Sequence, residues 1–243
     1  MGASVKKKQK GYFDHLEDLR FEIIYVLVFF IISCIAAFVF SEKIIEFLTA
    51  PAKAAGTTLN YFKPQEKFVS YIKASFLAGL LLTVPFLLYR CAAFIAPGLL
   101  PAERKSFYAA ALSAPALFYG GAAFAFYVIV PFALSFFHGF GGAQIEPVWG
   151  IENYINLVSA VSAACGAGFL MPALLFILIR AGIIDTKHVN KFRPYAIIAI
   201  LIFASIITPP DVITQVLIAV PVYLLFEISV LLANAGKKGY IKR

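Results

Sequence analysis

The stretch FYAAALSAPALFYGGAAFAFYVIVPFALSFF, residues 107–137, contains no charged side chain and decides the class of fold. It is longer than the roughly 20 apolar residues that an α-helix needs to cross a hydrocarbon core about 30 Å thick. Pro115, Gly120 and Gly121 lie within it. Backbone polar groups in lipid must pair internally, so an apolar span of this length is expected to be helical. The sequence therefore predicts a membrane-spanning helix here.

Five further apolar stretches predict an all-α, polytopic protein with six transmembrane helices. The six spans are expected at about 21–40, 68–89, within 107–137, 154–179, 195–207 and 212–233. Pro85 is expected to break the second of these helices. At about 1.5 Å per residue the fifth span covers only roughly 20 Å, so it is too short for an ordinary bilayer. A hydrophobic content of 61% and a mean hydropathy of +0.86 agree with a membrane protein.

The basic residues are sorted between the two sides of these spans. Sixteen of the 21 lysines and arginines lie in the N-terminal segment, the loops after spans two and four, or the C-terminal segment. The other five lie between Lys43 and Lys73. Positive charge beside membrane spans stays on the cytoplasmic side, so both termini are expected in the cytoplasm. The basic residues behind the net charge of +8 are expected to set this orientation and to meet anionic lipid headgroups, so no nucleic-acid partner is predicted.

The chain is expected to form a single membrane domain over residues 1–243, with mobile basic tails at 1–11 and 234–243. The apolar run Ile23–Phe40 exceeds the roughly 7–15 residues of a signal-peptide core, and no small-residue cleavage site follows it. The first span is therefore expected to remain in the mature protein. On the opposite side, the turn 208–211 is tight, so spans five and six are expected to form a short hairpin.

The sequence contains no motif that predicts an enzyme. It has no HExxH, GxSxG, CxxC or Walker sequence, and its three histidines lie in separate loops. The cysteines are odd in number and are expected to pack as small apolar residues: Cys34, Cys91 and Cys165. No cofactor and no metal site is predicted.

Acidic residues collect at the expected cytoplasmic edge and are almost absent from the middle of the spans. Residues 12–20 predict a short amphipathic helix on which Asp14, Glu17 and Asp18 share one face. Glu103 follows Pro101, which suits the first position of a helix, and would lie in the first turn. Two interpretations remain open for these carboxylates: a solvated helix face and an ordinary helix start, or a patch that binds a cation.

Four motifs, taken in order, resemble the TatC family, the multispanning subunit of the twin-arginine protein translocase. They cover roughly residues 12–232 and comprise His15-Leu16-Glu17-Asp18-Leu19-Arg20, Phe94-Ile95-Ala96-Pro97-Gly98-Leu99 with Glu103-Arg104, Gly166-x-Gly168-Phe169-x-x-Pro172, and Thr208-Pro209-Pro210-Asp211-Val212 with Gln215, Pro221 and Phe226-Glu227. The resemblance implies a cupped helix arrangement, a location in the cytoplasmic (inner) membrane, and export of folded proteins driven by the proton-motive force.

The resemblance also implies which residues act. The family binds signal peptides that carry paired arginines, and the matching positions are Glu17, Asp18, Arg20, Phe94, Pro97, Glu103 and Arg104. Single-span partners of the TatA and TatB type would dock at the turn between spans five and six and on span six: Thr208, Pro209, Asp211, Gln215 and Glu227. Assembly with further copies of the chain is also implied.

Two positions depart from the family pattern. Asp18 stands where the family usually has glutamate, and the neighbouring Glu17 could take its place. Leu170 stands where the family commonly has a glutamate after the span-four phenylalanine, so an expected carboxylate is missing from the groove. Apart from the resemblance, a solute transporter or channel is the alternative. Such a protein would be expected to have more charge at mid-depth and often an internal repeat.

Overall fold

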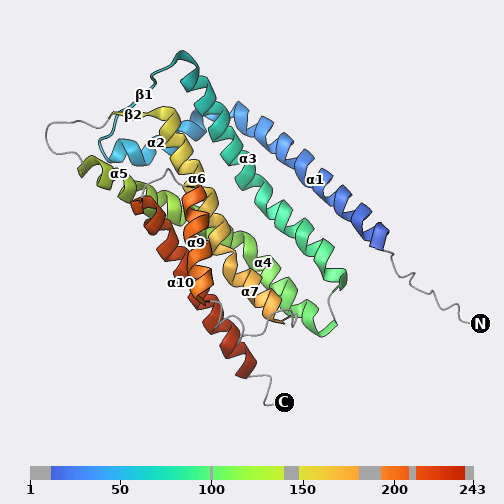
Figure 1. Ribbon diagram of the computed structural model, residues 1–243. Helices are drawn as coiled ribbons and strands as arrows, with labels where there is room; N and C mark the ends of the chain where they lie inside the picture. Colours follow the sequence, from blue (N-terminus) through green and yellow to red (C-terminus); the bar gives the residue numbers. More distant parts are fainter. Residues whose placement is uncertain (1–11, 99–100, 140–147, 181–192, 208–211, 239–243) are drawn as a thin grey trace, which may run out of the picture.

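The computed structural model describes residues 12–98, 101–139, 148–180, 193–207 and 212–238, which are almost entirely helical (Figure 1). In these ranges, two short helical segments depart from α-helical geometry: the 3₁₀ turn η1 and the π-helical η2. The elements are α1 Tyr12–Val39, α2 Ser41–Ala54, β1 Leu59–Asn60, α3 Pro64–Ile95, η1 Ala96–Gly98, α4 Pro101–Phe124, η2 Ala125–Ile129, α5 Val130–Gly139, β2 Trp149–Gly150, α6 Ile151–Phe169, α7 Met171–Arg180, α9 Arg193–Ile207 and α10 Val212–Lys238.

The positions and lengths of the apolar helical stretches agree with the six predicted spans. Within the described residues, four helical stretches are long and apolar enough to cross a membrane: Leu16–Val39, Pro64–Gly98, Phe107–Gly139 and Ile151–Ile179. Arg193–Ser205 and Gln215–Leu231 are shorter apolar helices, which correspond to the predicted spans five and six. Helix α10 continues beyond the predicted boundary at 233 to Lys238, while residues 239–243 and the predicted tail 1–11 lie outside the described residues.

The helices place two groups of connections at opposite ends of the molecule. Figure 1 shows the start of α1, the end of α3, the start of α4 and the end of α10 at one end. Helices α2 and α5 and the strands β1 and β2 lie at the other end. The two strands pair in parallel, Leu59 with Trp149 and Asn60 with Gly150. The chain therefore crosses the molecule repeatedly and has two different end faces.

Helix α1 is longer than predicted. The sequence suggested a separate amphipathic helix over residues 12–20, but α1 runs without a break from Tyr12 to Val39. No glycine or proline lies between these residues, so nothing in the local sequence interrupts the helical hydrogen bonds. The acidic residues of the first motif are thus carried on a continuous helix.

The predicted break of the second span at Pro85 is wrong, because α3 continues through Pro85 to Ile95. Proline has no N–H, so the carbonyl of Leu81, four residues earlier, loses its helical donor. The hydroxyl of Tyr119 on α4 donates to that carbonyl at 2.8 Å. A neighbouring helix therefore supplies the hydrogen bond that Pro85 cannot, which membrane helices require.

Replacing Tyr119 with phenylalanine should lower the free energy of unfolding by about 1 kcal/mol, the net worth of one such hydrogen bond. The loss should become smaller in a Pro85→Ala background, because the alanine restores a backbone N–H that can donate to the carbonyl of Leu81. Unfolding in detergent, followed for the four proteins of this double-mutant cycle, measures the coupling. Equal losses in the two backgrounds would show that the Tyr119 hydroxyl does not compensate for Pro85.

The fourth span is divided at Leu170, where α6 ends and α7 begins. Pro172 removes an N–H just beyond this point, and the amide of Leu170 bonds to Ala167 at 3.1 Å in a tighter turn. Earlier in the same helix, a Cβ on Gly168 would lie 2.7 Å from Val222 of α10. The glycine therefore allows α6 and α10 to approach closely.

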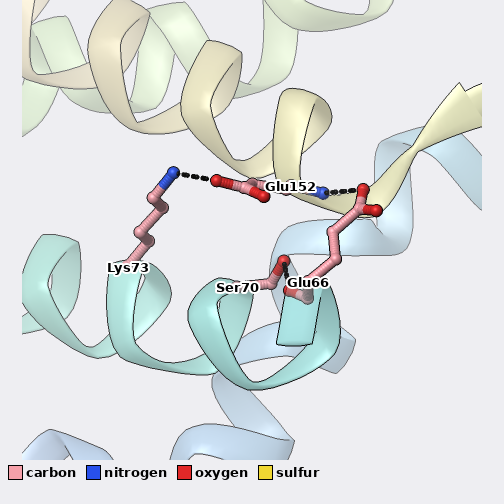
Figure 2. A network of polar contacts seen from close by, with 4 residues as sticks. All are labelled: Glu66, Ser70, Lys73 and Glu152. Carbon is pink, nitrogen blue, oxygen red and sulfur yellow. Dashed lines mark hydrogen bonds and ion pairs between the residues drawn. The ribbon is translucent and has the colours of Figure 1, made fainter. Parts of the chain in front are cut away.

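A polar network joins α3 to α6 at the end that carries the strands (Figure 2). Glu66 is 5% exposed, and its carboxylate accepts the backbone N–H of Phe62 at 2.7 Å and of Lys63 at 3.3 Å. It also lies 3.4 Å from the N–H of Glu152, the second residue of α6. The Glu152 side chain in turn binds Lys73 of α3 at 2.5 Å.

This network leaves little space for a side chain at position 150. A Cβ on Gly150 would lie 2.9 Å from Oε1 of Glu66. Nearby, the fully buried Tyr154 donates its hydroxyl to the carbonyl of Leu48 in α2 at 2.7 Å. The start of α6 is thus fixed to both α2 and α3. These contacts fix α3 at one end of the molecule, and the same helix reaches the opposite end face with its last turn.

Candidate functional site

Three helix ends bring the predicted signal-peptide residues to the same end of the molecule. Glu17, Asp18 and Arg20 lie in the first turns of α1, Phe94 in the last turn of α3, and Pro97 in η1. Asp18 and Phe94 are half-buried. The remaining members with described side chains are exposed: Glu17, Arg20, Pro97 and Arg104.

Apolar side chains join the end of α3 and the turn η1 to the first part of α4. Ala92 and Ala96 form a buried cluster with Phe107 of α4. Helix α4 begins at Pro101, as predicted, so Glu103 lies in its first turn. The side chain of Glu103 lies outside the described part of the chain. Its backbone position places it where the helix dipole favours a carboxylate.

An ion pair joins α1 and α3 beside this group of residues. Glu22 of α1 pairs with Arg90 of α3, and both side chains are 25% exposed. The guanidinium carbon of Arg90 lies 4.8 Å from the centre of the Tyr25 ring. A carboxylate and an aromatic face together form a favourable environment for a guanidinium group. The chemistry available at this end therefore suits arginine side chains.

The groove position Leu170 lies against an apolar cavity of about 90 Å³. Its lining comes from α3, α4 and α7 and includes Leu88, Ile95, Phe107 and Leu174. No acidic or basic side chain contributes to this lining among the described residues. The carboxylate that the family pattern would place here is therefore replaced by packing between hydrocarbon side chains.

The predicted partner-docking residues are divided by the structure. Thr208, Pro209 and Asp211 lie outside the described residues. Gln215 donates to the carbonyl of Leu201 at 3.0 Å, which joins α10 to α9. Glu227 binds Arg193 of α9 at 2.9 Å and accepts the hydroxyl of Tyr223 at 2.9 Å. Gln215 and Glu227, the two predicted docking residues with described side chains, thus join α9 to α10.

Comparison with known proteins decides the family. The family model for Sec-independent protein translocase protein (TatC) matches residues 14–221. The chain belongs to the TatC family. A TatC protein of Magnetococcus marinus is 36% identical over 220 residues, which cover 89% of this chain and 81% of the relative. One from Aquifex aeolicus is 35% identical over 93% of this chain and 95% of its own length.

A solved TatC structure confirms the fold. The crystal structure of the twin-arginine translocase receptor TatC superposes with a TM-score of 0.84 at 35% identity, covering 92% of this chain and 99% of that chain. The six-span, all-α architecture and the cupped arrangement predicted from the sequence are therefore confirmed. This TatC-family chain is a multi-pass membrane protein of the Sec-independent translocase.

Sequence reasoning missed two features of this TatC-family chain. The sequence places Glu22 and Arg90 near the ends of two different apolar stretches, but nothing in it indicates that they form an ion pair. The Glu66–Glu152 contact was not predicted at all. Both contacts join residues far apart in the chain, so no local spacing reveals them. The sequence does show that each of these charged residues lies near the end of an apolar stretch, where a charged partner from another helix can be expected.

Proposed function

We propose that this chain is the receptor that binds twin-arginine signal peptides and takes part in the export of folded proteins. The observation that carries this proposal is the meeting of the ends of α1, α3 and α4, with acidic and aromatic family positions at one end face. The relative with the matching fold is described as a twin-arginine translocase receptor. Family membership and site chemistry thus support the same function.

The proposed contacts follow from the shape of arginine. A guanidinium is a planar fork that binds a carboxylate through two hydrogen bonds, and its face stacks on aromatic rings. Asp18 and Glu103 are proposed to take the two arginines, with Glu17 as a neighbouring carboxylate and Phe94 packing beside the peptide. Arg20, Pro97 and Arg104 are proposed to border the same surface. Partial burial at the membrane edge strengthens such pairs beyond exposed ones.

The chain is proposed to lie in the cytoplasmic (inner) membrane with this end face towards the cytoplasm. The proton-motive force across that membrane is proposed to drive export. The charge distribution supports this orientation, because the basic loops and both termini then lie on the cytoplasmic side. The network around Glu66 would lie on the opposite side. Signal peptides made in the cytoplasm would then reach the carboxylates directly.

Partner subunits are proposed to dock on the α9–α10 hairpin. Helix α9 has 15 residues, about 22 Å at helical rise, so a bilayer about 30 Å thick must thin beside it. Gln215 and Ser205 line a groove of about 300 Å³ with Ile198, Leu201 and Ile202. A single-span partner of the TatA or TatB type could bury an apolar face there and bond to the polar side chains.

The test compares peptides with two arginines and with two lysines, because lysine keeps the charge and removes the fork. The purified chain in nanodiscs should bind the RR peptide about tenfold or more tightly than KK. Asp18→Asn should remove most of this preference, and Glu17→Gln should remove less, because Asp18 is half-buried and Glu17 is exposed. Fluorescence anisotropy with labelled peptides measures each affinity. Equal affinity of the wild type for RR and KK would refute the proposed function.

A further inference from the structure

Helix α1, which packs against α3, has few buried residues of its own. In the most apolar window of α1, 11% of the residues are buried within the described structure, against 50% for the helix of span three. The described aromatic contacts are Phe29 stacked on Phe86 at 4.5 Å and Phe30 edge-on to Phe76 at 4.9 Å. Each dispersion contact is individually weak, so the apolar contacts outside these ring pairs offer only slight resistance to sliding or rotation of α1.

Two contacts in this interface are specific for position. A Cβ on Gly79 would lie 2.4 Å from the sulfur of Cys34, so the helices approach closely where the middle of α3 meets the last turns of α1. Near the end that carries the site, Arg90 binds Glu22 and covers the ring of Tyr25. An ion pair with a stacked guanidinium has a preferred geometry, so it limits both sliding and rotation of α1.

This ion pair lies one helical turn from the proposed receptor residues. Asp18 comes four residues before Glu22 on α1, and Phe94 comes four residues after Arg90 on α3. Since the two helices pack antiparallel, equal steps from a paired position lead to facing levels (Figure 1). Four residues correspond to about 6 Å of rise. Of the two position-specific contacts, the Glu22–Arg90 pair is the one at this end of the interface, and it therefore helps to determine which residue of α1 lies level with Phe94.

We propose that Glu22 and Arg90 are positioning residues for signal-peptide binding, which hold Asp18 at the level of Phe94 and thereby set the spacing between the carboxylates of α1 and α4. The inference rests on the proposed function, because it concerns the same site. Glu22 and Arg90 are not proposed to contact the peptide. They affect its affinity by fixing the position of α1 along α3, which is called the register of the two helices.

The test separates charge from register by exchanging the partners. Glu22→Gln and Arg90→Gln should each weaken RR-peptide binding by about fivefold, since contacting residues couple by amounts of this order. The exchanged pair, Glu22→Arg with Arg90→Glu, should regain most of the affinity, and Arg90→Lys should be intermediate. The matched control is Lys73→Gln, which breaks an ion pair of similar exposure at the opposite end and should leave peptide affinity unchanged.

A distance measurement shows whether register is the cause. Spin labels at Ile23→Cys and Tyr89→Cys, both exposed positions, report the α1–α3 separation once the three native cysteines are replaced by alanine. The distance distribution should broaden or shift in Arg90→Gln and return in the exchanged pair. If Arg90→Gln does not fold, Arg90→Lys and the exchanged pair provide the comparison.

The outcomes distinguish this inference from the proposed function. Loss of affinity in the single variants, with recovery of affinity and distance in the exchanged pair, supports positioning. Wild-type affinity in the folded single variants overturns it, and so does an exchanged pair that binds no better than they do. A wild-type chain that does not distinguish RR from KK removes the proposed function itself, and the inference with it.

Discussion

Replacing Glu103 with alanine is expected to abolish cross-linking of a twin-arginine signal peptide and to lower its affinity about 10- to 100-fold. A hydrogen bond to a charged group is worth about 1.5–3 kcal/mol, and removing the carboxylate leaves one guanidinium without its partner. Glu103 lies in the first turn of α4, so its loss also removes a favourable interaction with the helix dipole. The dipole interaction is the weaker of these two effects, so the affinity for the peptide should fall more than the stability of the protein.

The measurement is photocrosslinking from a probe at Phe94, read beside export of a folded reporter protein. Glu103→Gln tests the charge alone and should bind weakly, because a neutral amide pairs poorly with a guanidinium. Glu46→Ala in α2 is the matched control, since Glu46 is an exposed glutamate at the opposite end of the molecule. Retained cross-linking and export in a folded Glu103→Ala protein would remove Glu103 from the site.

The fold could be predicted largely from apolar length and charge. The uncharged run 107–137 and the five other stretches predicted the helices, because a membrane helix must satisfy its backbone within one continuous segment. The short fifth span and the start of α4 at Pro101 also follow from the local sequence. These features depend on residues close together in the chain, and they are therefore visible without a structure.

The contacts between helices could not be predicted in this way. Pro85 predicted a broken helix, because the sequence does not reveal that Tyr119, from another helix, donates to the carbonyl left without a partner. The pairing of Glu22 with Arg90 likewise depends on how α1 and α3 are aligned. For the candidate site, residue types came from motifs, while the arrangement of the three helix ends required the folded chain.

Replacing Glu66 with alanine is expected to lower the free energy of unfolding by about 3 kcal/mol. Its buried carboxylate accepts backbone N–H groups from Phe62, Lys63 and Glu152, and alanine would leave these donors without their partner. The bonds from Phe62 and Lys63 fix the chain as it enters α3, and that from Glu152 fixes the start of α6. One side chain thus joins two spans through bonds to their backbone.

Thermal and denaturant unfolding in detergent, compared with the exposed-residue variant Glu46→Ala, would measure this effect. The control should change stability by no more than about 0.5 kcal/mol, as surface substitutions usually do. Glu66→Gln should fall between the two, because its amide oxygen still accepts hydrogen bonds but carries no charge. The expected loss comes from backbone N–H groups that lose their acceptor and not from long-range attraction between charges. Adding salt to the wild-type protein, which screens such attraction, should therefore not lower its stability to the same extent. A Glu66→Ala protein as stable as the control would mean that water satisfies these N–H groups equally well.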